Sequence, residues 1–435
     1  MKKKIRNGLV LLPVLLFCVL TVVACSDSDK LPTTSASVTI NYPDGVKDLK
    51  VTKEAFIFTN LTTGEKQVFN SSEGISLSDG LYDCAYKASV TYTNGEGGDA
   101  VTADGNINGK KENVTIKGGS AAVTIDTYLF AANDDFVFEE IFFSGTLRSS
   151  GSQYYGDGYF KIYNNTDHVL YADGLAFCES KFKSTLYFDY TPDIRKDTAT
   201  VWSIYVIPGR GTDHPVQPGQ SMTICDTGID HRAANANSFN LSHADFEWYD
   251  QSTNPSFLDI DSPSVPNLDK WYCYTQTFYV LHNRGFSSYM LARIPVDKVK
   301  YLKDYWYSYN YVQHTQAGDF PMTQQAYKIP NSWIVDGVNC SVASNRVWNV
   351  LPPSIDAEWT HCGTIDHDVT RYFRSIRRKL LYVKDGIMKL KDTNNSSEDF
   401  NTECIPSIIE EQHTATNANG STATVITYDG VQIKK

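Results

Sequence analysis

Short runs that alternate apolar and polar residues fill the chain between residues 37 and 130. The runs cover 37–42, 54–61, 66–70, 80–94, 113–118 and 120–130, and turn residues such as Thr63-Gly64 and Ser78-Asp79-Gly80 separate them. A period of two predicts strands with one buried face, and nothing in this region has a helical period. We therefore expect an N-terminal β-sandwich over residues 37–131.

A second set of strand-like runs follows the small and acidic residues 131–135, which we take as the domain boundary. It begins with 139–143, 158–165 and 169–175 and returns at 217–224, 332–338 and 374–379. Residues 271–281 are apolar on both faces, which predicts a buried central strand. Short helices are expected at 241–249, capped by Ser242, and at 295–303, with Asp297 in its first turn. The polar segment 412–435 reads as a tail with one possible last strand at 425–433.

The motifs in these runs resemble known families. A hairpin at 59–65 ahead of Gly80-Leu81-Tyr82 resembles prealbumin-like sandwiches, which serve as spacers in surface proteins. Glu140, the run 159–164, the turn and strand 217–224, and the strands 332–338, 374–379 and 392–400 resemble the lamin-tail immunoglobulin-like domain, although Lys161 stands where Glu is usual.

These resemblances imply a mainly β protein in which the prealbumin-like sandwich precedes a lamin-tail-like, immunoglobulin-type sandwich over 136–411. A plain sandwich needs only ~100 residues. A large mixed insertion is therefore expected at about 178–331. The arrangement resembles Bacteroidetes lipoproteins of unknown function that are typically encoded beside TonB-dependent SusC-type transporters and SusD-type lids.

The first 24 residues read as a bacterial export signal. Lys2, Lys3, Lys4 and Arg6 precede an apolar run, and a small residue stands before Cys25. This order resembles a lipobox, which implies that Cys25 carries diacylglycerol and an acyl chain such as palmitate. Residues 25–36 would be a flexible tether, and its acidic start at 26–29 resembles a surface-export tag. The implied location is the outer membrane, facing the cell exterior; an ordinary signal with a chance cysteine is the alternative.

Charge and cysteine content narrow the function. The net charge is −11, and removal of the four basic signal residues makes it −15, which disfavours nucleic acid as a partner. Seven cysteines remain beyond Cys18 and Cys25, with no CxxC pair. An odd number leaves at least one thiol outside any internal disulfide, and buried free thiols are as plausible as disulfides.

The sequence contains no GxSxG, HExxH or phosphate-binding glycine loop, so we expect no enzyme activity and no cofactor beyond the lipid. Two metal sites are weak candidates: the donors between His361 and Asp368, and the calcium-loop-like series Asp392, Asn394, Ser396 and Glu403. In the second, Ser397 replaces the turn glycine, and a structural turn is favoured. The basic cluster between Arg371 and Lys379 fits a solvated strand face.

Aromatic residues are densest at 301–311, in the expected insertion. The candidate binding residues there are Tyr305, Trp306, Tyr307, Tyr309 and Tyr311. Such a group serves as core, as a protein interface or as a platform for a sugar or peptide. Our leading hypothesis is a non-catalytic surface lipoprotein that assists a SusC/SusD-type importer of oligopeptide or glycan. A stand-alone adhesin-like module is the first alternative, and a hydrolase with its site in the insertion is the second.

Overall fold

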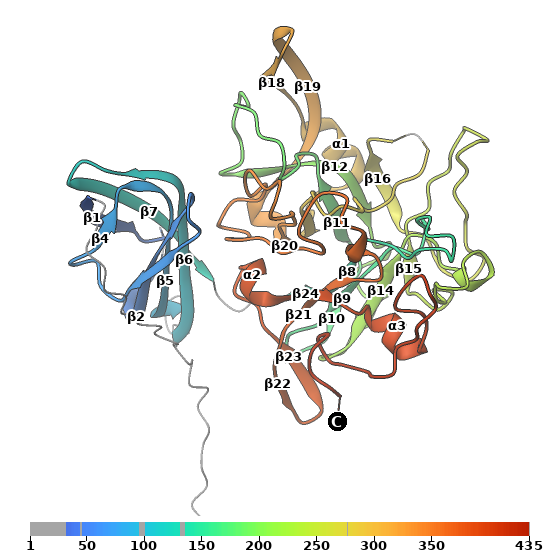
Figure 1. Cartoon of the computed structure of the whole chain (residues 1–435). Coiled ribbons are helices and arrows are strands. Elements are labelled where there is room, and N and C mark those ends of the chain that lie inside the picture. The colour runs from blue at the N-terminus through green and yellow to red at the C-terminus, as the bar shows by residue number, and fades with distance from the viewer. Residues whose placement is uncertain (1–31, 44–45, 95–100, 131–134, 276, 435) are drawn as a thin grey trace, which may run out of the picture.

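The protein consists of two β-domains in a computed structural model that describes residues 32–434 apart from 44–45, 95–100, 131–134 and 276 (Figure 1). The predictions for the signal peptide, Cys25 and the acidic tag lie outside these residues. Within them, no helix combines the length and the apolar character that a bilayer crossing requires.

The first domain is one sheet in the order β3-β2-β5-β6-β7-β1-β4. The strands are β1 (Thr33–Asn41), β2 (Lys47–Asn60), β3 (Lys66–Phe69), β4 (Ser76–Ser78), β5 (Gly80–Asn94), β6 (Val101–Ile116) and β7 (Ser120–Phe130). Buried side chains of β1, β4 and β7 share one core with those of β2, β5 and β6. The sheet therefore folds over on itself, which confirms a β-rich, sandwich-like first domain.

The alternation read from the sequence is visible in β5, where every second side chain from Tyr82 to Tyr92 is buried. The start of the domain differs from the expectation. β1 begins at Thr33 and buries Thr34 and Ala36, so the last four residues assigned to the tether belong to the sheet. Thr33, Ser35 and Ser37 are exposed between the inward-facing Thr34 and Ala36, so the polar run that suggested a linker is the alternation of a strand.

The second domain contains two larger sheets. One has the order β15-β14-β9-β8-β21-β24, with β8 (Val137–Phe142), β9 (Tyr159–Tyr163), β14 (Ser221–Cys225), β15 (Phe246–Glu247), β21 (Ser375–Arg378) and β24 (Phe400–Cys404). The other has the order β18-β19-β12-β11-β17-β20, with β11 (Leu175–Ser180), β12 (Thr198–Val206), β17 (Tyr289–Arg293), β18 (Trp306–Thr315), β19 (Gly318–Pro330) and β20 (Ile334–Val338).

Smaller elements complete this domain. β16 (Asp269–Cys273) pairs with β12, β10 (Leu170–Tyr171) with β13 (Pro215–Val216), and β22 (Leu380–Lys384) with β23 (Ile387–Leu390). The helices are α1 (Lys298–Asp304), α2 (Ser396–Asp399) and α3 (Ser407–Gln412).

The two larger sheets enclose one aromatic core. Phe138 and Phe160 of the first sheet meet Phe177 of the second, and the Phe160 and Phe177 rings stack 4.2 Å apart. Trp248 lies against the same pair and is fully buried. This packing makes the second domain sandwich-like as well.

The range expected to hold a large insertion, about 178–331, also contributes strands to the two larger sheets. β12, β14 and β17 come from that range and are strands of the two larger sheets. The additions are instead separate segments, namely the loop 181–197, the irregular stretches 226–245 and 248–268 on either side of β15, and α1 with the β18–β19 hairpin. A sequence read without strand pairing cannot separate scaffold strands from the loops between them.

Three local expectations also change. Residues 241–249 form a turn and β15 rather than a helix, because Phe246 and Trp248 are needed in the core. Of the central strand expected at 271–281, only residues 271–273 are in a strand among the described residues, as the end of β16, although Tyr279 and Leu281 are buried. The helix expected at 295–303 is confirmed as α1, and Asp297 caps it by accepting a hydrogen bond from the Lys300 amide.

The C-terminal segment is part of the folded domain. Ala415, Ala423, Thr427 and Asp429 are buried, and the Thr427 hydroxyl bonds to the carboxylate of Glu410. Residues 425–433 contain an isolated bridge between Thr427 and Ile433 in place of the expected strand. Polar composition suggested a free tail, but these polar groups find partners inside the protein.

The two domains meet through β6 and the segment around α2. The Lys110 amine is almost fully buried between Asp83 and Glu112 of its own domain and Glu358 of the second, at 3.4, 3.5 and 3.2 Å. The Asn108 amide donates to the Thr393 carbonyl at 2.9 Å, and Lys87 pairs with Glu398. In Figure 1, α2 lies on the side of the second domain that faces the first.

Candidate functional site

The most distinctive surface is on the β18–β19 hairpin, which extends past the rest of the second domain in Figure 1. Its strands pair from Trp306↔Tyr327 to Thr315↔Gly318, and most side chains near its tip are exposed. Because side chains alternate along a strand, Tyr307, Tyr309 and Tyr311 share one face. Their rings follow one another at 5.6 and 6.2 Å.

A loop from the sandwich covers this tyrosine face. Phe182 and Tyr190 stack 4.1 Å apart, and both meet Tyr309 edge-on at 5.4 and 5.6 Å. Further along, Phe188 lies 4.5 Å from Tyr311. The sequence-based prediction did not include these partners. The signal was present, because four of the nine residues 182–190 are aromatic and indicate a second aromatic segment.

The candidate residues therefore divide by strand face. Tyr305 stacks on Tyr301 at 5.1 Å in the hydrophobic cluster of β11, β12 and β17, whereas Trp306 is 38% exposed and its ring lies 4.5 Å from that of Tyr327. Tyr309 is buried, whereas Tyr307 and Tyr311 are half-buried. The structure thus brings Tyr307, Tyr309 and Tyr311 together and places Tyr305 and Trp306 elsewhere.

Beside Tyr311 the loop and the hairpin separate, and a cleft of about 460 Å³ opens between them. We call it the aromatic cleft, and its lining is Tyr187, Phe188, Asp189, Thr191, Asn310, Tyr311, Val312, His314, Pro321, Met322 and Thr323. The lining contains one carboxylate, that of Asp189, and neither Lys nor Arg. A narrower gap continues inward past Tyr190, Tyr307 and Trp348.

Three phenols between the covering loop and the hairpin are hydrogen-bonding groups at neutral pH. Burial raises the pKa of Tyr307 to about 12, and its hydroxyl lies 2.5 Å from that of Thr200. Burial likewise raises the pKa of Tyr190 and of Tyr309. The site therefore offers aromatic faces, neutral hydroxyls and one negative charge. Such a set can bind and orient a ligand, and the Asp189 carboxylate and the His314 ring are part of it.

The residues of the calcium-loop-like series bond to separate groups of the protein instead of converging as a ligand set. Asp392 pairs with the Arg378 guanidinium at 3.1 Å, and the Ser396 hydroxyl donates to Asp356 at 2.5 Å. The Asn394 carbonyl accepts a hydrogen bond from the Ala357 amide, and the exposed Glu403 carboxylate accepts one from the Gly363 amide at 3.2 Å. The four residues thus have four separate partners.

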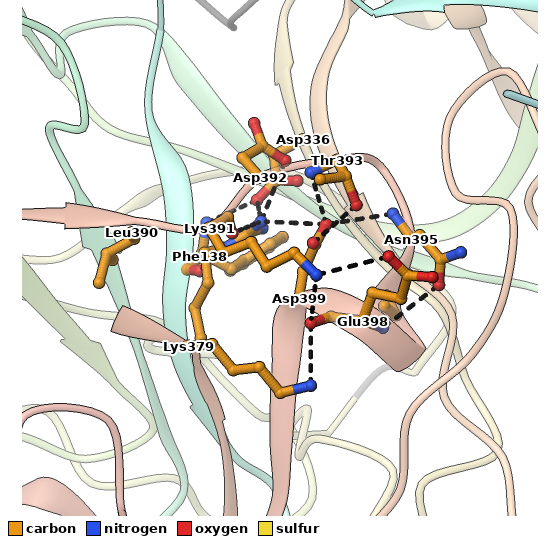
Figure 2. Close-up of polar contacts among 12 residues, drawn as sticks. Phe138, Asp336, Lys379, Leu390, Lys391, Asp392, Thr393, Asn395, Glu398 and Asp399 are labelled. Atoms are coloured by element: carbon orange, nitrogen blue, oxygen red, sulfur yellow. Dashed lines mark hydrogen bonds and ion pairs between the residues drawn. The ribbon is translucent and has the colours of Figure 1, made fainter. Parts of the chain in front are cut away.

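Figure 2 shows why this loop is ordered. Asp399 accepts hydrogen bonds from the amides of Thr393 and Asn395 at 2.7 and 3.1 Å, while Asp336 and Asp392 lie close by. Lys379 and Lys391 both reach the Glu398 carbonyl. Nowhere in the described part of the chain are three or more His, Cys, Asp or Glu arranged to hold a metal ion.

The donors between His361 and Asp368 also point to different partners. Asp366 pairs with Arg284 at 3.0 Å, and Asp368 caps the turn at Thr370. Cys362 is buried in the core, where burial raises the pKa of its thiol. His361 lies 3.7 Å from Glu403.

The expectation of a solvated basic face was wrong for the β21 arginines. Arg377 and Arg378 are 3% and 2% exposed because β21 lies between β8 and β24 and is covered on both faces. Arg377 pairs with Glu410 at 2.8 Å, and Arg378 pairs with Asp336 at 2.5 Å. Arg371 is buried as well and donates to the Asn283 and Asp368 carbonyls. These cations bind the C-terminal segment and the 392–399 loop to the sandwich.

One hydroxyl–amine pair resembles a nucleophile with its base. The Lys183 amine lies 2.6 Å from the Ser287 hydroxyl, and Glu179 binds both. Burial lowers the pKa of Lys183, yet Ser287 is 0% exposed and Glu179 is 0% exposed. With the hydroxyl sealed inside the protein, this cluster holds β11 to the loop before β17.

All seven cysteines in the described residues are free thiols, and Cys273 alone among them is half-buried. The structure therefore favours the interpretation of these residues as small apolar side chains.

Comparison with known proteins places the chain near a family whose function is unknown. A family model described as "Protein of unknown function (DUF4876)" matches residues 217–407. No curated protein matches the chain.

Among solved structures, a DUF4876 family protein from Bacteroides thetaiotaomicron VPI-5482 is 20% identical, with a TM-score of 0.51, over 86% of this chain and 95% of that one. The two proteins therefore share a fold. A structure described as "a putative cell adhesion protein" from Bacteroides eggerthii DSM 20697 is 10% identical over 69% of this chain and 80% of that one, but its TM-score of 0.13 is too low to indicate a common fold.

Proposed function

We propose that this protein is a non-catalytic surface lipoprotein that binds its ligand in the aromatic cleft and assists a TonB-dependent SusC/SusD-type importer of oligopeptides or glycans. It would be anchored to the outer membrane through lipid on Cys25 and would face the cell exterior. The second domain would be a lamin-tail-like, immunoglobulin-type sandwich that carries the hairpin.

The observation that carries the proposal is the aromatic cleft itself. Tyr187 is 45% exposed and Phe188 and Tyr311 are half-buried, so large aromatic faces border an open space of about 460 Å³. Exposed aromatics of this kind are typical of binding surfaces, because ring faces supply contact area with little loss of rotamer entropy. The lipobox and the acidic tag support surface exposure, and the absence of CxxC, HExxH and GxSxG motifs favours binding over catalysis.

The test is purification of the tagged full chain from native membranes after mild cross-linking, followed by identification of the proteins that accompany it. We expect a SusC-type transporter and a SusD-type lid. A matched pair of variants, Phe188→Ala and Phe320→Ala, separates the cleft from the exposed hairpin tip, where Phe320 is 47% exposed and does not line the cleft.

Loss of ligand uptake with Phe188→Ala but not with Phe320→Ala supports the cleft as the binding site. A membrane-bound monomer with no transporter beside it would overturn the importer role and favour the adhesin-like module. Cys25→Ala should release a folded protein from membranes. Retention of the variant on membranes would refute the proposal that lipid on Cys25 is the anchor.

A further inference from the structure

We infer that the aromatic cleft takes an extended, basic peptide, which adds as a strand to the free edge of β18. This inference rests on the proposed function and deepens it, because it chooses peptide over glycan and states how the peptide is held.

The first argument is the position of the cleft. Asn310 donates to the Thr191 carbonyl at 2.8 Å and accepts from the Thr191 amide at 2.9 Å, so both backbone groups of Asn310 point away from β19. Backbone groups alternate sides along an antiparallel strand. Those of Val312 and His314 therefore also point away from β19, and both residues line the cleft.

The second argument is that the lining comes from both faces of the hairpin. Tyr311 and its partner Met322 are on one face, and Val312 with its partner Pro321 is on the other. A cleft lined from both faces lies at the edge of the strand. An edge offers a row of backbone donors and acceptors, which a polypeptide strand satisfies and a sugar does not match in spacing.

The third argument is that the edge is not protected. Exposed edge strands usually carry Lys, Pro or a bulge against unwanted pairing. Trp306–Thr315 contains no Lys, Arg, Asp, Glu or Pro, and its pairing with β19 runs without a register shift. The Thr191↔Asn310 bridge shows that this edge accepts a strand. The covering loop then turns away, and beyond the bridge no backbone partner for Val312 or His314 occurs in the described residues.

Charge indicates the character of the peptide. Asp189 is exposed in the cleft wall, and the nearby His314 is paired with Asp319 at 2.6 Å. With no Lys or Arg in the lining, the cleft favours a peptide that places a Lys or Arg side chain at Asp189 and apolar side chains on Phe188 and Tyr311. Alternation of side chains along the added strand permits both.

The experiment screens the full chain against a positional library of eight-residue peptides and measures the best binder by calorimetry. Two versions of that peptide carry backbone N-methyl groups on alternate residues, so each lacks the N–H donors of one edge. We expect one version to bind at least tenfold more weakly and the other to bind nearly as well as the parent, since each net hydrogen bond contributes roughly a factor of five and the weaker version loses at least two of them.

The protein variants form a matched pair. Val312→Pro removes the N–H that faces the cleft, and Val312→Thr keeps it. We expect about tenfold weaker binding for the proline variant only, and a several-fold loss for Asp189→Asn that grows smaller at high salt. If Val312→Pro misfolds, the N-methylated peptides still decide the question on the unmodified protein.

Equal binding of both N-methylated peptides would overturn the strand-addition geometry. Binding of neutral oligosaccharides that depends on Phe188 but not on the Val312 N–H would overturn the peptide while leaving the proposed binding site standing. If neither peptide nor oligosaccharide binds, and no transporter co-purifies, both proposals fail.

Discussion

Replacement of Arg378 by Met should destabilise the second domain strongly, because it leaves buried carboxylates without their cation. The guanidinium is 2% exposed and pairs with Asp336 at 2.5 Å and Asp392 at 3.1 Å, with Asp399 at 3.9 Å. It also donates to the Phe138 carbonyl at 2.6 Å. Met has a similar length and no charge, so the change removes the electrostatic partner while keeping most of the volume.

Breaking a buried ion pair by removing one partner costs roughly 3–5 kcal/mol. Urea unfolding followed by tryptophan fluorescence at pH 8 measures this as a lower midpoint at an unchanged slope. The control is Lys300→Met, which removes an exposed pair with Asp304 at 2.6 Å. Such exposed pairs contribute about 0–1 kcal/mol.

The pH dependence separates lost charge from lost packing. Burial raises the pKa of Asp336 to about 7 even though Arg378 lowers it. The folded state therefore binds more protons than the unfolded state between pH ~4 and 7. For this reason the contribution of Asp336 to the free energy of unfolding falls as pH rises through that window. Without Arg378 the pKa of Asp336 rises further, so the deficit of the variant should be largest at pH 8 and smaller at pH 5.

A second substitution, Asp336→Asn, should restore part of the stability lost in Arg378→Met, since it removes the uncompensated charge. A loss below about 1 kcal/mol at pH 8, at the level of an exposed pair, would refute the account of Arg378 as a required buried cation. A deficit of the same size at pH 5 and pH 8 would assign the loss to packing.

Three further predictions concern the aromatic cleft, the domain contact and the thiols. Tyr309→Ala should lower the free energy of unfolding in urea by about 3–5 kcal/mol, because Tyr309 is buried against Phe182 and Tyr190. Phe320→Ala, at an exposed position, should lower it by less than about 1 kcal/mol. Equal losses would contradict the division between buried and exposed aromatics. Lys110→Met should let the domains separate, seen as two calorimetric transitions and a larger radius in solution scattering, while Lys111→Met, on the exposed side of β6, should leave one compact particle. In a soluble form without residues 1–31, the thiols should react slowly with a disulfide reagent at pH 8, because burial raises the pKa of Cys273 to about 11 and that of Cys84 to about 12. In denaturant all seven thiols should react together. Fast reaction of several thiols in the native protein would contradict their burial.

Sequence patterns were most informative where one face of a strand is buried. The alternation of Tyr82, Cys84, Tyr86, Ala88 and Val90 locates β5 to the residue, and the strand at 159–163 was likewise expected. Patterns failed where burial depends on distant partners. Arg377 and Arg378 read as solvated because nothing local reveals that Glu410 and Asp336 lie opposite them, 33 and 42 residues away.

The same reasoning explains the candidate site. Tyr307, Tyr309 and Tyr311 could be found from composition, since three tyrosines at a spacing of two share a strand face. Phe188 and Asp189 could not be joined to them from sequence, because more than a hundred residues and the core strands of the sandwich separate the loop from the hairpin. Tyr305 and Trp306 were included by proximity, but Tyr305 packs in a different cluster and Trp306 is an exposed residue on the other face of the strand.

The early start of β1 determines how far the protein can stand from a membrane. β1 is ordered from Thr33, where the Thr34 hydroxyl bonds to Asp79 at 2.6 Å. If Cys25 carries the lipid, the eight residue steps to Thr33 span at most ~28 Å when fully extended. The first domain would then remain near the headgroups, and the height of the hairpin above the bilayer would be determined mainly by the folded body. The height of the β18–β19 tip would then vary by no more than the ~28 Å that the tether can span, for a given orientation of the folded body.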